Sequence, residues 1–399
     1  MKKQIYKNYT EFLKSFVLDT VPQVDGEVDY KQLIQLAKIN STEGIMNYMF
    51  MKNPQLLAQE YRDYAKSQCF REIAIYSCRA EQMKVLAKKL DEAGIDHLLF
   101  KGFVVREYFP EPELRTFGDI DFVIRIEDRQ KCDELMKDLR YEPRDNWEPA
   151  YSYLKETEYY EIHTDVMEID VSDKADYKGY YSHIWEHVVS SKITGLKHSY
   201  EFTPEFHFLY ILTHIAKHIG SSGAGIRMYL DIAFFIKHFD KSIDWNWISE
   251  ELKKLKFQEF SNMVLTAVEQ WFGVKSPLPL RKIEEETMED FLQFTIEGGV
   301  YGKFGRDQNV IFLKKQNRNV EEISKWKTLV FHIFPPVSSL KFRYNYLQKC
   351  PWLLPIAWVH RVLGNRDSWK RYAGHTKGIL SADTQEALKL KKLYKELGL

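Results

Sequence analysis

Residues 98–124 read LLFKGFVVREYFPEPELRTFGDIDFVI, and this stretch decides the fold that the sequence predicts. The apolar run Leu98–Phe100 predicts a short buried strand, and the dipeptide Lys101-Gly102 ends it. A helix of no more than two turns fits over 103–108, because two prolines follow closely. After a loop, the run Asp119–Ile124 predicts a second strand.

The second strand carries a pair of carboxylates. Side chains alternate between the two faces of a strand, so we expect Asp119 and Asp121 on one face and Ile120 and Phe122 in a core. Two carboxylates held this close repel each other, and a divalent cation with a preference for oxygen ligands, such as Mg²⁺, removes that penalty. The alternative interpretation is a strand end with two solvated Asp residues.

The turn between the first strand and the helix favours a bound anion. A strand–Gly–helix turn presents free backbone N–H groups, and Gly102 lets the backbone approach a phosphate closely. Lys101 adds a positive charge beside it. An anion site next to a metal-binding carboxylate pair is the layout that a nucleoside triphosphate requires.

With these residues the chain resembles the nucleotidyltransferase superfamily of the DNA polymerase β type. In that fold a Gly-containing turn opens a helix, and the next strand carries an Asp-x-Asp pair. The run FKG…YFPEPELRTFGDID is similar to the bacterial family of uncharacterised nucleotidyltransferases, through its Lys-Gly, Tyr-x-Pro, Leu-Arg and Asp-Ile-Asp. One departure is Lys101-Gly102-Phe103, where the superfamily usually has Gly-Ser, so the hydroxyl that usually contacts a phosphate is missing. The resemblance extends from about residue 30 to about residue 275.

The superfamily places a third carboxylate on a neighbouring strand. Residues 151–171 alternate as one or two strands, with Glu161, His163 and Asp165 on one face. Glu161-Ile-His163 resembles the Glu-Leu/Met-His of the family, which favours Glu161. Asp165 and Asp170 remain alternatives, the latter forming a rival pair with Glu168 on the opposite parity. For His163 we favour a structural role in orienting a neighbour.

The resemblance implies an α+β fold, with a small mixed-sheet nucleotidyltransferase core flanked by N-terminal and C-terminal helical regions. It implies that Asp119 and Asp121 hold two Mg²⁺ or Mn²⁺ ions and that Glu161 completes the site. The groups expected around the triphosphate of an NTP are Lys101, Gly102, Arg115 and Gly118.

Composition sets broader limits. With 399 residues the chain predicts two or three domains, and its net charge of +0 argues against a nucleic-acid coat protein. The four cysteines show neither metal-ligand spacing nor a disulfide framework, which fits a reducing cytoplasm. The N-terminus has no apolar signal-peptide region, and no apolar run is long enough to cross a membrane.

The pattern divides into four regions. Helical periodicity fills 1–95, the catalytic core occupies 96–200, a helical substrate region covers 201–275, and 276–399 is mostly helical and basic at its end. Within the last region we expect 299–319 to be a loop.

The third region supplies candidate acceptor-binding residues. A helix starting at Thr203-Pro204 carries His207, His214 and His218 on one face, and we expect His214 and His218 to line a cleft rather than bind zinc. Arg227, on the next helix, is the third candidate. It stands four residues before Asp231, which indicates an intrahelical ion pair as the alternative.

A Trp-rich apolar run, CPWLLPIAWVHRVLG, lies at 350–364 among basic residues that continue to position 371. One interpretation is an interfacial helix on an anionic membrane. We favour the other, a buried helix with a basic rim.

The function predicted is transfer of an NMP group from an NTP to a hydroxyl or phosphate on an unidentified small molecule, peptide or RNA end. One rival is a glycosyltransferase that uses Asp119-x-Asp121 as its metal motif, but the 95 helical residues that come first disfavour it. The other is a catalytically silent scaffold of the same fold, which the presence of all three acidic positions disfavours.

Overall fold

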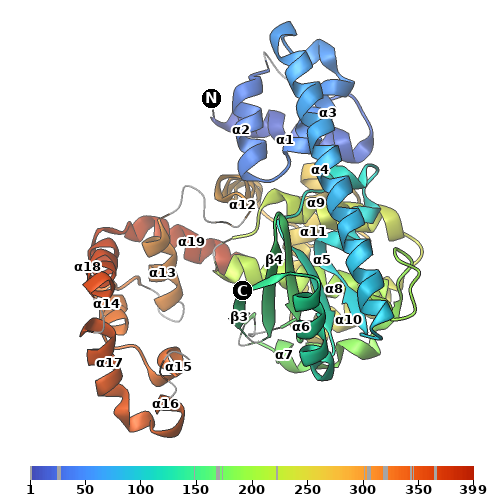
Figure 1. Cartoon of the computed structure of the whole chain (residues 1–399). Coiled ribbons are helices and arrows are strands. Elements are labelled where there is room, and N and C mark those ends of the chain that lie inside the picture. The colour runs from blue at the N-terminus through green and yellow to red at the C-terminus, as the bar shows by residue number, and fades with distance from the viewer. Residues whose placement is uncertain are drawn as a thin grey trace. The chain divides into compact units, whose positions relative to one another are not determined.

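The structure is a computed structural model that describes residues 2–24, 28–147, 149–167, 171–172, 174–221, 223–300, 302, 307–317, 322–341, 344, 346–363 and 366–399. The chain divides into two compact units, 1–302 and 303–398 (Figure 1). The boundary that we expected at 275–276 therefore lies inside the first unit. Three of the four expected regions belong to that unit together.

The N-terminal region is helical as predicted. Its helices are α1 (Lys2–Leu18), α2 (Tyr30–Ile39), α3 (Glu43–Lys52) and α4 (Gln59–Glu92), with a 3₁₀ turn at Pro54–Leu56. The Asp29 side chain caps α2 by accepting a hydrogen bond from the Gln32 backbone N–H. Gly94, with φ +63°, follows the end of α4 in the left-handed region that favours glycine.

One mixed sheet of seven strands forms the centre of the first unit. Its strands are β1 (His97–Leu99), β2 (Ile120–Ile124), β3 (Glu142–Trp147), β4 (Ala150–Lys155), β5 (Glu158–His163), β6 (Val188–Ser190) and β7 (Ser199–Phe202). Their order across the sheet is β3-β4-β5-β2-β1-β7-β6. The pairs β1–β7 and β2–β5 are parallel and the other pairs are antiparallel. The α+β fold class is thus confirmed.

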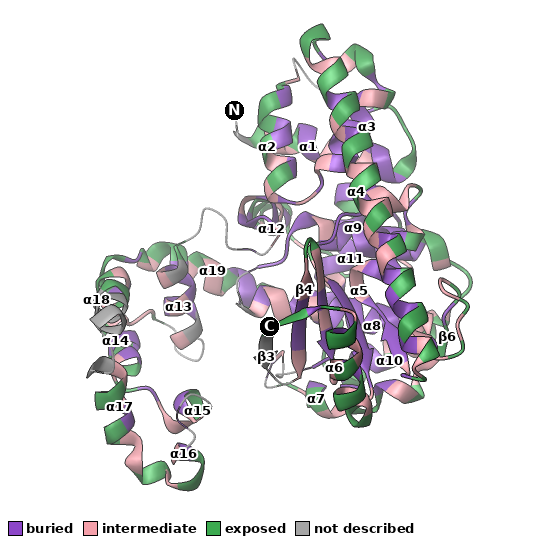
Figure 2. Ribbon diagram, viewed as in Figure 1, coloured by how far each residue is buried: buried purple, intermediate pink, exposed green. Residues whose placement is uncertain are grey.

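Helices cover both faces of this sheet. On one face, buried side chains of α4 and of α6 (Arg129–Asp138) pack against Ile120, Phe122 and Ile162. On the other face, Tyr210 of α8 (Pro204–Ser221) packs against Phe100, with ring centroids 5.4 Å apart. Figure 2 shows the strands largely buried and the outer side of α4 exposed. The polar face of β2 therefore looks toward α8.

The other elements of the first unit are both short turns and full helices. They are α5 (Lys101–Val105), 3₁₀ turns at Arg106–Tyr108, Pro112–Leu114 and Ile126–Asp128, α7 (Tyr177–Tyr180), a 3₁₀ turn at Tyr181–Glu186, α9 (Ile226–Phe239), α10 (Trp245–Lys254), α11 (Gln258–Phe272) and α12 (Glu285–Gly298). After α12 the chain returns to the end of α2, where the Val300 N–H donates to the Ile39 carbonyl at 2.8 Å. This contact places the segment after residue 276 with the N-terminal helices.

The described residues of the second unit form helices joined by turns and loops, and none of them lies in a strand. Its elements are α13 (Gln308–Gln316), α14 (Lys325–Ile333), α15 (Val337–Leu340), α16 (Tyr346–Lys349), a 3₁₀ turn at Pro351–Leu353, α17 (Leu354–Leu363), α18 (Arg366–Ser381) and α19 (Thr384–Glu396). The loop expected over 299–319 was wrong for α13, because Val310 and Leu313 pack in a small core with Ile379. The apolar run 310–313 is short and lies between polar residues, so it did not predict a helix.

The expectation of a buried helix at 350–364 was also wrong. Ala357 is fully buried, but Trp352, Ile356 and Val359 expose 75%, 57% and 58% of their surface. The helix has one side on the core and one side in solvent, and both sides are apolar. In the part of the chain that the structure describes, none of the helices combines the length and the apolar character that a membrane span needs.

Candidate active site

The parallel pairing of β2 with β5 brings acidic and imidazole side chains together. Asp121 pairs in register with Glu161, and Val123 with His163, so all three polar side chains point to the face that looks toward α8. His163 Nε2 lies 2.8 Å from Asp121 Oδ1 and 3.5 Å from Glu161 Oε2. One donor atom from each of the three residues lies within 4.8 Å of the others, which is the spacing that a shared metal ion needs.

Asp119 lies next to this cluster, one residue before the strand. β2 begins at Ile120, so the predicted strand was one residue too long, but Asp119 lines the same cavity as Asp121 and Glu161. Burial raises the pKa of Asp119, and the charges of Asp121 and Glu161 raise it further. The carboxylates therefore repel one another, and this repulsion is what a cation would relieve.

Lys101 neutralises Asp121. Its Nζ lies 2.6 Å from Asp121 Oδ1. Burial alone would lower the pKa of Lys101, but Asp121 outweighs it and holds the pKa above its ordinary value. Burial likewise opposes the charge on Asp121, and Lys101 and His163 together hold the pKa of that carboxyl well below its usual range. The backbone of Lys101 has φ +53°, a left-handed conformation that costs a non-glycine residue about 1 kcal/mol.

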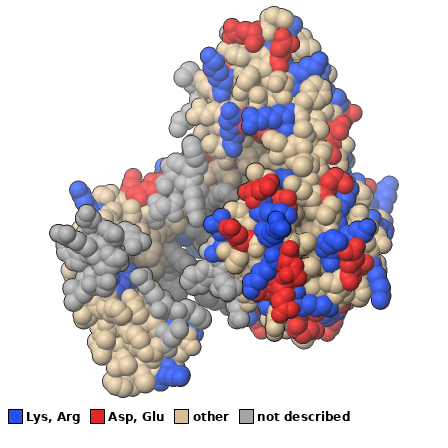
Figure 3. All heavy atoms as spheres, in the orientation of Figure 1, with Lys and Arg blue, Asp and Glu red and all other residues tan. Residues whose placement is uncertain are grey.

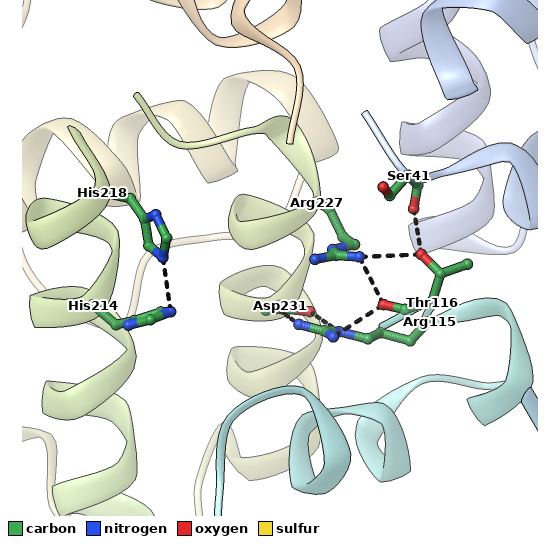
Figure 4. Close-up of polar contacts among 7 residues, drawn as sticks. All are labelled: Ser41, Arg115, Thr116, His214, His218, Arg227 and Asp231. Carbon is green, nitrogen blue, oxygen red and sulfur yellow. Dashed lines mark hydrogen bonds and ion pairs between the residues drawn. The ribbon is translucent and has the colours of Figure 1, made fainter. Parts of the chain in front are cut away.

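The guanidinium of Arg115 is held by hydrogen bonds to Asp231 and Thr116. Its Nε and Nη2 donate to the two carboxylate oxygens of Asp231 at 3.0 and 2.6 Å, and its Nη1 donates to the Thr116 carbonyl at 3.1 Å (Figure 4). Both partners of the ion pair are buried. A Cβ atom at Gly102 would overlap Nη1 of Arg115, so this glycine makes room for a guanidinium. These contacts hold Arg115 beside the Lys101-Gly102 turn, while its predicted contact with a phosphate stays a prediction.

Arg227 fixes the same loop from α9. Its Nη1 donates to the carbonyl and to the hydroxyl oxygen of Thr116 at 2.8 and 3.2 Å, and the Thr116 hydroxyl donates to the Ser41 carbonyl (Figure 4). The spacing indicated an intrahelical ion pair between Arg227 and Asp231 as the alternative. That interpretation was wrong, because Asp231 pairs with Arg115. Helix α9 thus anchors the loop that leads into Asp119.

His214 and His218 lie side by side on α8, with their Nε2 atoms 3.2 Å apart (Figure 4). Burial lowers the pKa of His218 to about 4, helped by the positive charges of Lys101, Lys217 and Arg227. Burial also holds the pKa of His214 well below its usual range. Both imidazoles are neutral near pH 7 and can accept or donate a hydrogen bond. His207, which the sequence placed on the same face, instead packs among the rings of Tyr108, Phe202 and Phe235.

These groups line one cavity of about 230 Å³. All ten predicted site residues lie along it: Lys101, Gly102, Arg115, Gly118, Asp119, Asp121, Glu161, His214, His218 and Arg227. The sequence missed Tyr210 and Lys217, which also line it, and treated His163 as structural. The signal for Tyr210 and Lys217 was present, since they stand four residues before and three residues after His214 on one helix face.

The rival carboxylates differ in their placement. Asp165 follows the end of β5 and accepts a hydrogen bond from the Met167 backbone N–H at 3.1 Å. In the described part of the chain it is not among the residues that line the cavity. Glu168 and Asp170 lie outside the described residues.

Comparison with known proteins gives one match. The family described as "Uncharacterised nucleotidyltransferase" matches residues 26–273, which is more than half of the chain. The chain belongs to this family. No curated protein and no solved structure matches it. The match spans α2 to α11 and so contains the whole sheet and every residue of the candidate site.

Folding stability should fall in acid because of His207. Burial lowers the pKa of His207 to about 3 from 6.5. Below pH 6.5 the imidazole of His207 binds a proton in the unfolded chain but stays neutral in the folded chain. Its contribution to the free energy of unfolding is therefore complete above pH 6.5 and is lost as the pH falls toward 3. The loss should be about 1.4 kcal/mol per pH unit across this window. Urea unfolding at pH 7 and pH 5 measures it.

His207→Gln should reduce the pH dependence of the unfolding free energy by about 1.4 kcal/mol per pH unit, and the share from His214 and His218 should remain. His183→Gln is the matched control, because the side chain of His183 is 70% exposed. Equal pH dependence in His207→Gln and in the wild-type protein would contradict the prediction.

Proposed function

We propose that this protein transfers an NMP group from an NTP to a hydroxyl or phosphate acceptor, with Mg²⁺ or Mn²⁺ as the metal. The observation that carries the proposal is the side-by-side placement of Asp121 and Glu161 on parallel strands, with Asp119 and Lys101 beside them. Membership of the nucleotidyltransferase family supports the reaction class.

The donor set fits a hard divalent cation. Asp121 and Glu161, with Asp119 along the same cavity, offer the carboxylate oxygens that Mg²⁺ and Mn²⁺ prefer, and His163 offers an imidazole nitrogen. These four residues would hold the metal. A bound divalent ion would neutralise charge on the triphosphate and on the leaving pyrophosphate.

Side chains of the cavity would also bind the substrates, accept a proton and position the loop before Asp119. Lys101 supplies a positive charge at the cavity, beside the expected position of the triphosphate. Glu161, whose side chain is 32% exposed, can accept the proton of the acceptor hydroxyl. His214 and His218 lie across the cavity on α8 and supply neutral hydrogen-bonding groups for the acceptor. Arg227 is held by Thr116, so it positions the loop before Asp119 rather than moving freely.

Calorimetry with ATP, CTP, GTP and UTP, each with Mg²⁺, tests the proposal. At least one NTP should bind with a metal-dependent heat, and Asp119→Ala combined with Asp121→Ala should abolish that binding because it removes the charges that attract the cation. Asp165→Ala is the matched control, since this carboxylate lies outside the cavity lining among described residues.

The rival functions give other outcomes. A glycosyltransferase would bind a sugar nucleotide in preference to the NTPs. A silent scaffold would bind an NTP without consuming it when the protein is supplied with a metabolite extract. Unchanged NTP affinity in the double variant, with its fold intact by thermal melting, would refute the metal site.

A further inference from the structure

Large apolar side chains are exposed on two neighbouring helices of the second unit. On α14 and the residue that directly follows it they recur every fourth residue, and on the 3₁₀ turn and α17 they recur at intervals of four and three residues. Such spacing places residues of a helix on one side. We call them together the apolar face: Trp326, Val330, Phe334, Trp352, Ile356 and Val359. Their exposed fractions are 72%, 43%, 51%, 75%, 57% and 58%.

Hydrogen bonds and a ring contact join α17 to α14 and to the residues that follow it. The helices that carry the apolar face are therefore packed against each other. Trp358 Nε1 donates to the Pro335 carbonyl at 2.8 Å, and Arg361 Nη1 donates to the His332 carbonyl at 2.6 Å. The rings of Phe334 and Trp358 have centroids 5.0 Å apart. The opposite side of α17 already packs against Leu340 and Leu347 through Ala357. The apolar face therefore remains exposed while the helices that carry it are held by other contacts.

The charged residues of the segment that carries this face have one sign. The segment 323–366 contains seven Lys and Arg and not one Asp or Glu. The whole unit, 303–398, has 19 Lys and Arg against 7 Asp and Glu, a net charge of +12, although the full chain has a net charge of +0. Lys327 follows Trp326 in the sequence, Lys349 stands three residues before Trp352, and both are exposed. In Figure 3 the lower part of this unit shows tan with blue at its edge, and the acidic residues in view lie at its upper end.

We propose that the apolar face docks on an anionic lipid bilayer. Exposed Trp side chains favour the boundary between headgroups and acyl chains, and Lys side chains around them favour anionic headgroups. Helices of 9 and 10 residues are too short to cross a bilayer but suit one that lies at its surface. A nucleic acid would match the positive charge, yet it offers no apolar medium for Ile356 and Val359. Docking goes beyond nucleotidyl transfer and would bring the catalytic unit to a membrane.

Vesicle flotation with the full chain tests this inference. Vesicles of equal parts phosphatidylcholine and phosphatidylglycerol should carry the protein, and vesicles of phosphatidylcholine alone should carry far less. Trp326→Ser combined with Trp352→Ser should weaken binding by about tenfold or more, because two interfacial anchors are lost. Phe70→Ser is its matched control, since Phe70 is 53% exposed on α4 of the first unit.

Two double Lys→Glu variants distinguish binding through the apolar face from attraction by the net charge of the unit. Lys327→Glu with Lys349→Glu should weaken binding to the anionic vesicles by about tenfold or more. Lys389→Glu with Lys392→Glu changes the charge of the same unit equally but lies on α19, and it should retain most of the binding. Brominated phosphatidylcholine should quench tryptophan fluorescence in the wild-type protein and less in the double Trp variant.

Three results would overturn the inference. One is the absence of flotation with anionic vesicles. The second is equal loss of binding in both lysine pairs, which would show attraction by net charge alone. The third is a wild-type dimer, or a bound duplex nucleic acid, that the double Trp variant loses while vesicle binding stays unchanged.

Discussion

Glu161→Gln should lower the turnover of nucleotidyl transfer by about 10²-fold or more, because it removes either a metal ligand or the group that accepts the acceptor's proton. The substitution keeps the size and hydrogen-bonding shape of the side chain and removes only its charge. Glu161 pairs in register with Asp121 across parallel strands, so its side chain emerges on the cavity face of the sheet. Steady-state turnover at saturating NTP and Mg²⁺ measures the effect.

The same variant should keep its fold. Glu161 makes its nearest ion-pair contact with His163 at 3.5 Å, and its charge raises the pKa of Asp119 by repulsion. Removing that charge should leave the melting temperature without metal level or higher, while the additional stability given by Mg²⁺ and NTP should shrink. Asp165→Asn is the control, because this side chain caps a turn outside the cavity lining of the described residues. Full activity in Glu161→Gln with loss of activity in Asp165→Asn would reverse the two assignments.

The core of the site was predictable because it depends on local periodicity. The alternation of a strand is enough to place Ile120 and Phe122 in the core and Asp121 on the opposite face, and the same parity puts Glu161 beside His163. Only the pairing of β2 with β5 had to be supplied by the resemblance to the family. The first residue of β2 was placed one position too early because strand ends leave no mark in an alternating pattern.

The remaining contacts depend on which segments meet in three dimensions. The spacing of Arg227 and Asp231 indicates a local ion pair, but the true partner of Asp231 is Arg115, 116 residues away. The apolar residues of α17 predict a buried helix. The sequence does not show that one apolar side of this helix is exposed. The short strands β6 and β7 owe their hydrogen bonds to β1 and to each other rather than to a strong pattern of their own.

Asp231→Asn should destabilise the protein by about 3–5 kcal/mol, because it leaves the buried guanidinium of Arg115 without its counter-charge. Asp231 and Arg115 are 4% and 6% exposed, so water cannot replace the lost carboxylate. Urea unfolding at pH 7 measures the change. Glu81→Gln removes an acid from an exposed ion pair with Lys84 and should change stability by less than about 1 kcal/mol. A stability of Asp231→Asn equal to the wild type would contradict the buried pair.

Replacing both partners, with Arg115→Met and Asp231→Leu, distinguishes the effect of the ion pair on folding stability from its effect on the position of the loop. A buried ion pair exchanged for apolar side chains of similar volume is often neutral, so this double variant should return to within about 2 kcal/mol of the wild type. Its activity should stay low, because Arg115 also donates to the Thr116 carbonyl and packs against Gly102, which connects the loop before Asp119 to Lys101. A positioning role predicts a raised KM for the NTP and a lowered kcat in a protein that melts normally. Recovery of both stability and activity would mean that Arg227, through its own bonds to Thr116, is sufficient to hold the loop.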